Sequence, residues 1–173
     1  MNSNAQVLLL PVNSAGILLD PVLTRSKTLY PDNYQRYHRA CRDGSLQVGS
    51  CLIHKCEYER AGLSANSNSN QPIYIANLVV SDHPYHSTRK RWLIAALNDL
   101  GQQLMPLIRY KGIRKMSVLT RPLISSNPNA TAATNILPLD WQSTILPLLI
   151  EHLQDLPKLR IELHVPKSID TPS

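Results

Sequence analysis

The chain alternates short apolar segments with longer segments of helical period, and this alternation restricts its fold more than any other feature. Val7-Leu8-Leu9-Leu10 is a continuous apolar run, which is typical of a strand buried on both faces of a sheet. The run at 160–165 alternates apolar and polar residues, so we expect a strand with one solvated face there. Other strands are predicted for residues 46–53, with an interruption at Gly49, and for residues 72–80 and 115–120.

Helical segments separate these predicted strands. Aromatic and apolar residues recur at three- and four-residue spacing over 31–42, and Gly44 is the expected stop. A long helix follows the strand at 72–80 and must end or kink at Pro106, because proline cannot donate the intrahelical bond. Strands that alternate with crossover helices indicate a three-layer α/β domain. The expected helix N-caps are Asp32, Ser87 or Thr88, and Asp140.

Length and composition limit what kind of protein this is. The 173 residues suit one domain, which we expect to span 5–166 and to be followed by a disordered polar tail at 167–173. No stretch approaches the roughly 20 apolar residues that span a bilayer. The three cysteines form no Cys-x-x-Cys pair, so we expect no disulfide framework and a reducing cytoplasmic location.

The net charge of +6 favours anionic partners such as nucleotides, nucleic acid or phosphates. An ordinary solvated surface of lysine and arginine explains the same charge equally well. Aromatic residues make up only 5% of the chain, which leaves few platforms for stacking bases.

Four segments carry a resemblance to a known family. They are Val12-Asn13-x-x-Gly16 running without a gap into 30–41, the Gly-x-x-x-x-Gly of 44–49, Ile75-Ala76-Asn77-Leu78, and Pro122-Leu123 with Leu139-Asp140-Trp141. In this order they resemble the macrodomains, which hold ADP-ribose, and above all the antitoxin-type macrodomains that remove ADP-ribose from DNA. The resemblance implies a three-layer α/β/α fold with a mixed, largely parallel central sheet. The family's leading strand is expected to be missing or truncated, because only six residues precede Val7.

The resemblance also implies ligand contacts. Asn13 matches the asparagine that faces the distal ribose, although it equally suits a strand end that needs its backbone groups satisfied. Gly16 either keeps the first loop tight around a ligand or serves as an ordinary turn glycine. The second loop has no glycine, and its hydroxyl and amide side chains either donate to a ligand or form a polar surface loop. The candidate ligand-binding residues are Asn13, Gly16, Asn77, Arg89, Ser125, Ser126 and Asn127.

The departures from the family pattern predict a degenerate site. Leu19-Asp20-Pro21 stands where the family has glycine, lysine and glycine. Leucine adds bulk, aspartate repels phosphate, and proline lacks an N–H donor, so each change opposes anion binding. Ser81 occupies the position of the subgroup's catalytic lysine and cannot act as a cationic acid.

Few residues offer catalytic chemistry. Asp20, Asp82 and His86 are the acids and bases expected near the cleft, and Asp82 and His86 are the weak catalytic candidates. The run at 82–86 contains two histidines and a carboxylate, but Pro84 separates the histidines and no further ligand has motif spacing, so we expect neither a metal nor a cofactor. A basic cluster of His86, Arg89, Lys90 and Arg91 either receives phosphates or forms a solvated helix start.

Three functions are compatible with these observations. The first is a divergent macrodomain that binds ADP-ribose or an ADP-ribosylated macromolecule, with nucleic acid as a candidate carrier, and that lacks efficient catalysis. The second is an active ADP-ribosyl glycohydrolase that acts on ADP-ribosylated DNA or protein. The third is a macrodomain fold that has lost nucleotide binding and serves as an interaction module. The sequence predicts no membrane partner and leaves the oligomeric state open.

Overall fold

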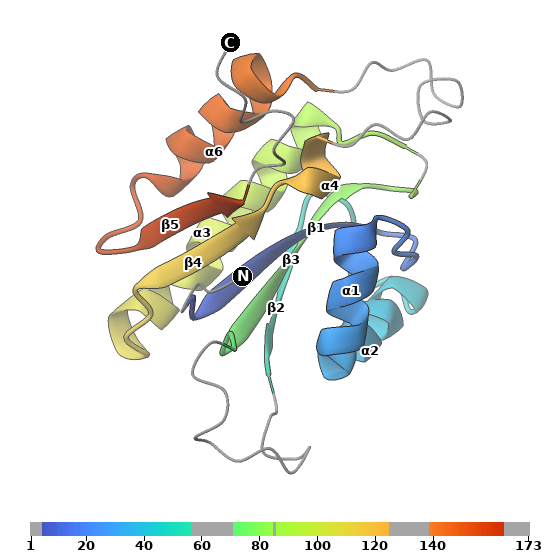
Figure 1. Cartoon of the computed structure of the whole chain (residues 1–173), viewed down its shortest axis with the longest axis horizontal. Helices are drawn as coiled ribbons and strands as arrows, with labels where there is room; N and C mark the ends of the chain where they lie inside the picture. Colours follow the sequence, from blue (N-terminus) through green and yellow to red (C-terminus); the bar gives the residue numbers. More distant parts are fainter. Residues whose placement is uncertain (1–4, 57–70, 85, 125–138, 165–173) are drawn as a thin grey trace.

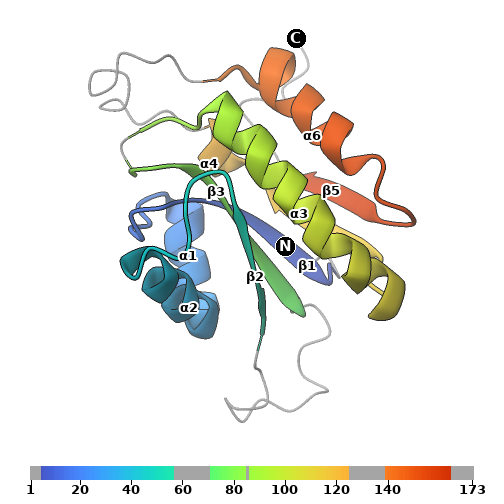
Figure 2. The ribbon, with the colours of Figure 1, turned by 180° about the vertical axis from the view of Figure 1, so that it is seen from behind.

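The computed structural model describes residues 5–56, 71–84, 86–124 and 139–164, and these form one sheet with helices on both faces (Figures 1 and 2). The strands lie in the order β2-β3-β1-β4-β5. In chain order the elements are β1 (Val7–Asn13), α1 (Pro21–Leu29), α2 (Pro31–Arg42), β2 (Cys51–Lys55), β3 (Tyr74–Ser81), α3 (Lys90–Tyr110), β4 (Lys115–Leu119), α4 (Arg121–Ile124), a π-helical turn η3 (Trp141–Ile145), α6 (Leu146–Leu153) and β5 (Arg160–His164).

Strand β1 lies at the centre of the sheet, and all seven of its residues are buried. It runs parallel to β3 on one side and to β4 on the other, and β4 is parallel to β5. Among the described strands, only β2 is antiparallel to its neighbour, β3. Burial on both faces explains why the strand is a continuous apolar run. The predicted mixed, largely parallel sheet is therefore confirmed.

Each face of the sheet packs against its own helices. Helices α3 and α6 cover one face, while α1 and α2 cover β1, β3 and β2 on the other, as the two opposite views show (Figures 1 and 2). Alternate residues of β3 serve the two cores: Ala76 and Leu78 face α3, whereas Ile75 and Val79 face α1 and α2. Each fully buried aliphatic side chain contributes about 1.5–3 kcal/mol to folding. The fully or almost fully buried residues of α3 are Leu93, Ala96, Leu97, Leu100, Leu104 and Ile108.

Helix α1 was not predicted from the sequence. Asp20 is its N-cap and accepts a hydrogen bond from the backbone N–H of Val22 at 2.9 Å. Pro21 stands at the first helical position, where its fixed φ and missing N–H cost nothing. The Asp20-Pro21 pair thus starts a helix, which gives the aspartate a structural role at the position where the macrodomain pattern has a lysine.

Several predicted boundaries were wrong. Strand β2 begins at Cys51 rather than at Leu46, because 46–50 forms the turn in which Gly49 has a φ of +80°. Helix α2 begins at Pro31 with Tyr30 as N-cap, so Asp32 lies inside its first turn. Neither Ser87 nor Thr88 caps α3, whose N-cap position is Arg89.

Pro106 does not end α3, which runs on to Tyr110. The buried neighbours Leu104 and Ile108 hold the last turns of the helix against the sheet. Asp140 does cap its helix, accepting from the N–H of Ser143 at 2.8 Å, and the first turn that follows is π-helical. The predicted tail at 167–173 lies outside the described residues. Among the described helices, none is long and apolar enough to cross a membrane.

Candidate functional site

The carboxyl ends of β1, β3 and β4 meet at one edge of the sheet, which is where open α/β sheets bind ligands. A register shift after Val12 places Asn13 opposite Ser81. The backbone N–H of Ser14 then donates to the carbonyl of Ser81 at 3.0 Å. The loop after β1 is therefore fastened to the end of β3 at its first residue.

Asn13 holds the conformation of this loop. Its Oδ1 accepts hydrogen bonds from the N–H groups of Ala15, at 3.0 Å, and Gly16, at 3.1 Å, and its Nδ2 donates to the carbonyl of Ile17 at 2.7 Å. From helix α2, the hydroxyl of Tyr37 donates to the Asn13 carbonyl, and the side chain of Asn13 is buried. Burial raises the pKa of Tyr37, so this hydroxyl stays a donor at all ordinary pH values. The contact of Asn13 with a ribose stays a prediction, and the contacts within the protein are those of a loop scaffold.

Gly16 lies where the loop meets helix α2, and a side chain there would be crowded. Its φ of +78° lies in the left-handed region, and a Cβ at this position would lie 3.1 Å from His38 Nδ1 and 3.3 Å from Cys41 Cβ. The Gly16 carbonyl lies 3.2 Å from His38 Nδ1 and accepts from the Tyr34 hydroxyl at 3.3 Å. The loop therefore rests directly on α2, and glycine fits best at the contact.

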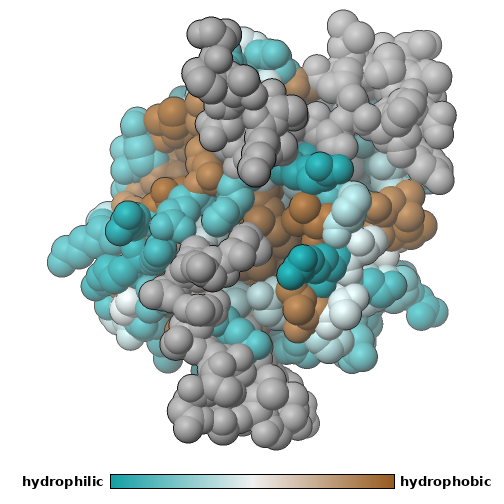
Figure 3. All heavy atoms as spheres, in the orientation of Figure 1, coloured by the Kyte–Doolittle hydropathy of each residue, from teal (hydrophilic) through white to brown (hydrophobic). Residues whose placement is uncertain are grey.

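The remainder of the loop exposes both apolar side chains and backbone donors. Ile17 is 46% exposed and Leu19 is 48% exposed, and hydrophobic atoms lie at the surface near the position of this loop (Figure 3). Within the described residues, no atom accepts a hydrogen bond from the backbone N–H groups of Ile17, Leu18 and Leu19. The loop thus keeps open amide donors although its glycines are replaced.

Asp20 faces a cation from the end of a different strand. Its Oδ2 lies 3.6 Å from Nε of Arg121, the first residue of α4, which is separated from β4 by Thr120 alone. The Asp20 side chain is largely buried, whereas that of Arg121 is about half exposed. In the macrodomain pattern, Asp20 opposes anion binding, and Arg121 is not a motif residue. Its position just after the buried strand β4 was nevertheless a sequence signal for a cation at this edge.

The turn after β3 carries the second set of candidate residues. Ser81 is buried, and its hydroxyl donates to the carbonyl of His83 at 3.2 Å. His86 Nδ1 lies 2.8 Å from Asp82 Oδ1, and both side chains are partly exposed. Although partial burial acts to raise the pKa of Asp82, hydrogen bonds from His86 and from its own backbone, together with the charges of His86 and Arg89, bring it below its usual value. Asp82 is therefore an ionised partner that fixes the orientation of His86.

Arg89 begins helix α3 beside this turn. Its backbone N–H donates to the carbonyl of Val80 at 3.1 Å, and its guanidinium lies 4.8 Å from the centre of the Trp92 ring. This cation–π contact holds the guanidinium of Arg89, a predicted ligand residue, over the Trp92 ring of the same helix. Within the described residues, no group of three or more histidine, cysteine, aspartate or glutamate side chains is placed to hold a metal ion.

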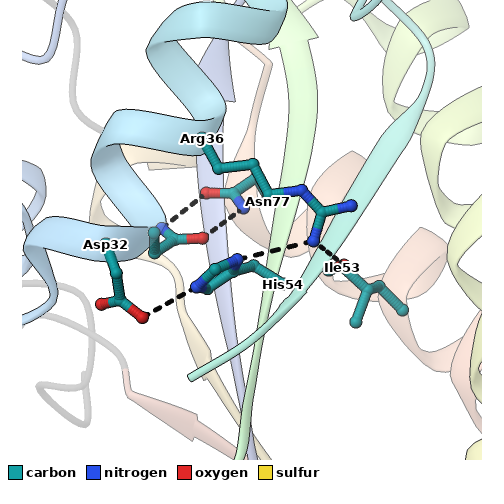
Figure 4. A network of polar contacts seen from close by, with 6 residues as sticks. Asp32, Arg36, Ile53, His54 and Asn77 are labelled. Atoms are coloured by element: carbon teal, nitrogen blue, oxygen red, sulfur yellow. Dashed lines mark hydrogen bonds and ion pairs between the residues drawn. The ribbon is translucent and has the colours of Figure 1, made fainter. Parts of the chain in front are cut away.

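Asn77 lies in the middle of β3, inside a polar network that joins the sheet to α2 (Figure 4). Its amide exchanges two hydrogen bonds with that of Asn33, at 3.1 and 2.9 Å, and donates to the carbonyl of Leu52. Nearby, His54 Nε2 lies 2.9 Å from Asp32 Oδ2. Asn77 has only 1% of its surface exposed, and its hydrogen bonds join α2 to strands β2 and β3. Its contact with a ligand stays a prediction.

The remaining predicted ligand residues Ser125, Ser126 and Asn127 lie outside the described residues. The described residues that lie together at the carboxyl edge are those of the loop at 13–20, residues 81–84 and 86 of the turn after β3, and Arg121. Among the described residues, this edge carries open backbone amides, the pair of Asp20 with Arg121 and the Asp82–His86 pair. The amides and the half-exposed Arg121 are the groups that can meet an anion.

Comparisons with known proteins identify the fold. No family model matches the chain. Over 127 residues the chain is 29% identical to a Thermus aquaticus protein described as DNA ADP-ribosyl glycohydrolase, an alignment that covers 73% of this chain and 31% of that relative. The matched region thus spans less than a third of the relative's length.

Solved structures agree with this result. The macrodomain of Thermus aquaticus DarG matches with a TM-score of 0.70 at 24% identity, covering 95% of this chain and 91% of that one. The macrodomain of Mycobacterium tuberculosis DarG gives 0.71 at 20% identity, with the same coverage of 95% and 91%. A structure described as Thermosipho africanus DarTG in complex with ADP-ribose gives 0.69 at 18% identity, covering 98% of this chain and 40% of that one.

The mixed five-stranded sheet with helices on both faces is therefore a macrodomain fold. The resemblance to the antitoxin-type macrodomains, which the sequence segments had indicated, is confirmed by the Thermus relative and the DarG structures.

Proposed function

We propose that the chain binds ADP-ribose or an ADP-ribosylated ligand at the carboxyl edge of its sheet, and that it does so without efficient catalysis. The observation that carries this proposal is the loop after β1. Asn13 and Gly16 fix its backbone, while the N–H groups of Ile17, Leu18 and Leu19 have no acceptor among the described residues. The relation to a structure described as a complex with ADP-ribose supports the choice of ligand.

The loop binds a diphosphate through its backbone. Successive amide groups make an anion-binding concavity whatever their side chains, provided that these point away from the ligand. The exposed side chains of Ile17 and Leu19 then border the site instead of filling it. Arg121 supplies the positive charge that the family places on a loop lysine, and its planar guanidinium suits bidentate contact with phosphate.

Ligand-induced stabilisation tests the proposal. At a hundredfold excess over Kd, ADP-ribose should stabilise the fold by about 2.7 kcal/mol. NAD, AMP, adenosine and short DNA serve as the comparison panel in the same thermal-shift experiment. Adenosine should give little stabilisation, because it lacks the phosphates that the loop amides bind. If ADP-ribose gives no stabilisation at millimolar concentration, the proposal is wrong and an interaction module takes its place, for which the exposed Ile17 and Leu19 supply apolar contacts.

Two substitutions with opposite signs locate the phosphates. Arg121→Gln should weaken ADP-ribose binding about tenfold or more, since it removes the cation beside the loop. Asp20→Asn should strengthen binding several-fold, because asparagine keeps the helix cap while the repulsive charge is lost. Arg109→Gln, at the far end of α3, is the matched control and should change nothing. If the wild type and both site variants bind ADP-ribose with equal affinity, the phosphates do not bind at this loop.

The Asp82–His86 pair favours one second candidate, an ADP-ribosyl glycohydrolase. Hydrolysis of a glycosidic bond needs a base that takes a proton from the attacking water and an acid that protonates the leaving group. Asp82 would orient His86, and the imidazole Nε2 would take a proton from the water that attacks C1 of the ribose while the bond between C1 and the modified group breaks. The imidazolium would then return this proton to the released group. Ser81, at the position of the subgroup's lysine, supplies no charge to that reaction.

Release of ADP-ribose from ADP-ribosylated DNA separates the two candidates. An enzyme should lose its activity in His86→Gln and most of it in Asp82→Asn, while both variants still bind ADP-ribose. A binder without turnover should release no more ADP-ribose than a blank reaction. Unchanged release in both variants would exclude this pair from any mechanism.

A further inference from the structure

Strand β5 forms one edge of the sheet, and its outer side carries open backbone groups. The N–H of Arg160 and the carbonyl of His164 take part in the ladder with β4, at 2.7 and 3.3 Å. Because the direction of these groups alternates along a strand, Ile161 and Leu163 turn their N–H and C=O groups away from β4. Within the described residues, these outward groups have no hydrogen-bond partner. A further strand can pair with such a row of donors and acceptors.

The opposite edge of the sheet, formed by β2, is covered. The backbone N–H of Cys51 donates to Asp99 of α3 at 2.8 Å, and the Cys51 carbonyl accepts from Gln103 at 2.7 Å. Arg36 of α2 donates to the carbonyl of Ile53 at 3.4 Å. Helix side chains thus occupy backbone groups of β2 and protect this edge from pairing with another chain. Among the described residues, β5 has no such cover.

An apolar groove lies between the open strand β5 and helix α6. Its volume is about 210 Å³, and it is lined by Leu149, Ile150, Leu153, Gln154, Ile161 and Leu163. Ile150 of α6 is 50% exposed. Helix α6 lies at the β5 end of the sheet, away from α1 and α2 (Figures 1 and 2). This edge therefore combines open hydrogen-bonding groups with apolar surface.

The sequence around β5 is complementary to itself in one antiparallel register. With Ile161 opposite Ile161 of a second copy, the outward backbone groups of the two strands meet. Leu159 then faces Leu163 on the side of α6, and Arg160 faces Glu162 on the other side. A register centred on Arg160 or on Glu162 would place like charges directly opposite each other, which is destabilising. The charges of β5 therefore select a second copy of the same strand, in one register.

Both members of the charged pair can take a partner in a second copy. Arg160 is exposed and, in the part of the chain that the structure describes, forms no ion pair. Lys115 Nζ lies 3.0 Å from Oε1 of Glu162, which leaves Oε2 to accept from a guanidinium. The two-fold symmetry of such a contact forms the pair of Arg160 with Glu162 twice.

We propose that β5 pairs antiparallel with β5 of a second copy of this chain, centred on Ile161, and joins the two sheets into one. Because an antiparallel edge contact keeps the faces of the two sheets aligned, the α6 helices of both copies lie on the same face and close the apolar grooves between them. Strand β4 separates this contact from the loop after β1, so both candidate ligand sites stay open. The proposal is independent of ADP-ribose binding.

Sedimentation equilibrium of the whole chain tests the proposal between about 1 and 500 µM, a range that covers the weak affinities of small interfaces. Salt at about 0.15 M screens the repulsion between two copies that each carry a net charge of +6. The wild type should pass from monomer to dimer within this range. In the dimer, the amides of Ile161 and Leu163 should exchange hydrogen more slowly than in the monomer, because they gain acceptors.

Charge reversal tests the register. Arg160→Glu and Glu162→Arg should each weaken the dimer at least about tenfold, because each places like charges opposite each other. An equimolar mixture of these two variants should form a heterodimer, in which every 160–162 pair again has opposite charges. The double variant Arg160→Glu/Glu162→Arg should regain the homodimer for the same reason. The control Arg39→Glu reverses an exposed charge on α2, at the other end of the sheet, and should dimerise like the wild type.

Four results would overturn the proposal. A wild type that is monomeric at every concentration has no such contact, and a dimer that persists in both single variants uses another surface. Failure of the mixture to form a heterodimer would exclude the 160–162 register. Ile150→Asp, which changes an exposed side chain outside the strand, should also weaken the dimer about tenfold or more. An unchanged dimer in Ile150→Asp would exclude the groove, and this variant keeps the test valid if the strand variants do not fold.

Discussion

The loop at 13–20 and the turn at 81–86 lie at the same edge of the sheet but use their polar side chains in different ways. In the loop, Asn13 uses its whole amide to bind neighbouring backbone groups, and Asp20 caps a helix. In the turn, Asp82 and His86 bind each other and stay partly exposed. A polar residue that matches a family motif can therefore be part of the scaffold, whereas the partly exposed Asp82–His86 pair lies in residues that no motif marks.

The largest expected effect concerns the scaffold role of Asn13. Asn13→Ala leaves two N–H groups and one carbonyl without their partner and should lower the free energy of unfolding by about 3 kcal/mol. Asn13→Asp keeps the acceptor for Ala15 and Gly16 but sets a buried carboxylate oxygen against the carbonyl of Ile17, so it should lower the stability as well. Urea denaturation measures both. A loss below about 1 kcal/mol in Asn13→Ala would show that the loop holds its shape without the amide, and the contrast between the two regions would disappear.

The contact between the loop and helix α2 gives the second effect. Gly16→Ala should cost about 2 kcal/mol, because the new Cβ adds crowding against His38 and Cys41 to the cost of a positive φ. Gly44 is the matched control, since its φ is +80° and, among the described residues, no atom lies within 4 Å of the place that a Cβ would take. Gly44→Ala should cost about 1 kcal/mol in the same denaturation experiment. If both substitutions lower the free energy of unfolding by the same amount, helix α2 shifts enough to accommodate the new Cβ at position 16.

The smallest effect should come from the turn. Because the folded-state pKa of Asp82 is lowered, its ionisation stabilises the fold above the ordinary carboxyl pKa of about 3.9, and this contribution is lost as the pH falls through the lowered value. The pair is partly exposed, so Asp82→Asn should cost only about 0.5 kcal/mol at neutral pH. Urea midpoints of the wild type and the variant should converge as the pH is lowered from neutral to well below the ordinary carboxyl pKa of about 3.9. If the wild type and Asp82→Asn differ in urea midpoint by the same amount at neutral and at acid pH, the ionised form of Asp82 does not stabilise the fold.

Much of the fold could be predicted because its signals are local. The apolar run at 7–10 predicts a strand buried on both faces, and β1 is indeed the centre of the sheet. Helix α1 escaped prediction because few of its residues are buried, Leu23 and Ser26 among them, so that its apolar period is weak. The Asp20-Pro21 pair is a sequence signal for a helix start. From the macrodomain pattern, the same pair was interpreted as a change that opposes phosphate binding.

The polar contacts of the site could not be predicted, because they join residues far apart in the chain. Asn33 and Asn77 are separated by 44 positions, and His54 and Asp32 by 22. No spacing rule connects such pairs before the fold places α2 against the sheet. The same holds for Arg121 and Asp20, which meet only because β4 ends beside the loop after β1. Whether Asn13, Gly16, Asn77 and Arg89 touch a ligand stays a prediction.

The central position of β1 has a kinetic consequence. Both of its partners, β3 and β4, come much later in the chain, with Val7 opposite Tyr74 on one side and Met116 on the other. Such long-range pairings make folding slow, because the entropy of closing large loops is lost before the contacts form. During synthesis, β1 leaves the ribosome well before β3 and stays unpaired until β3 follows. In the interval before that pairing, the apolar strand β1 is unpaired and the chain is most exposed to aggregation.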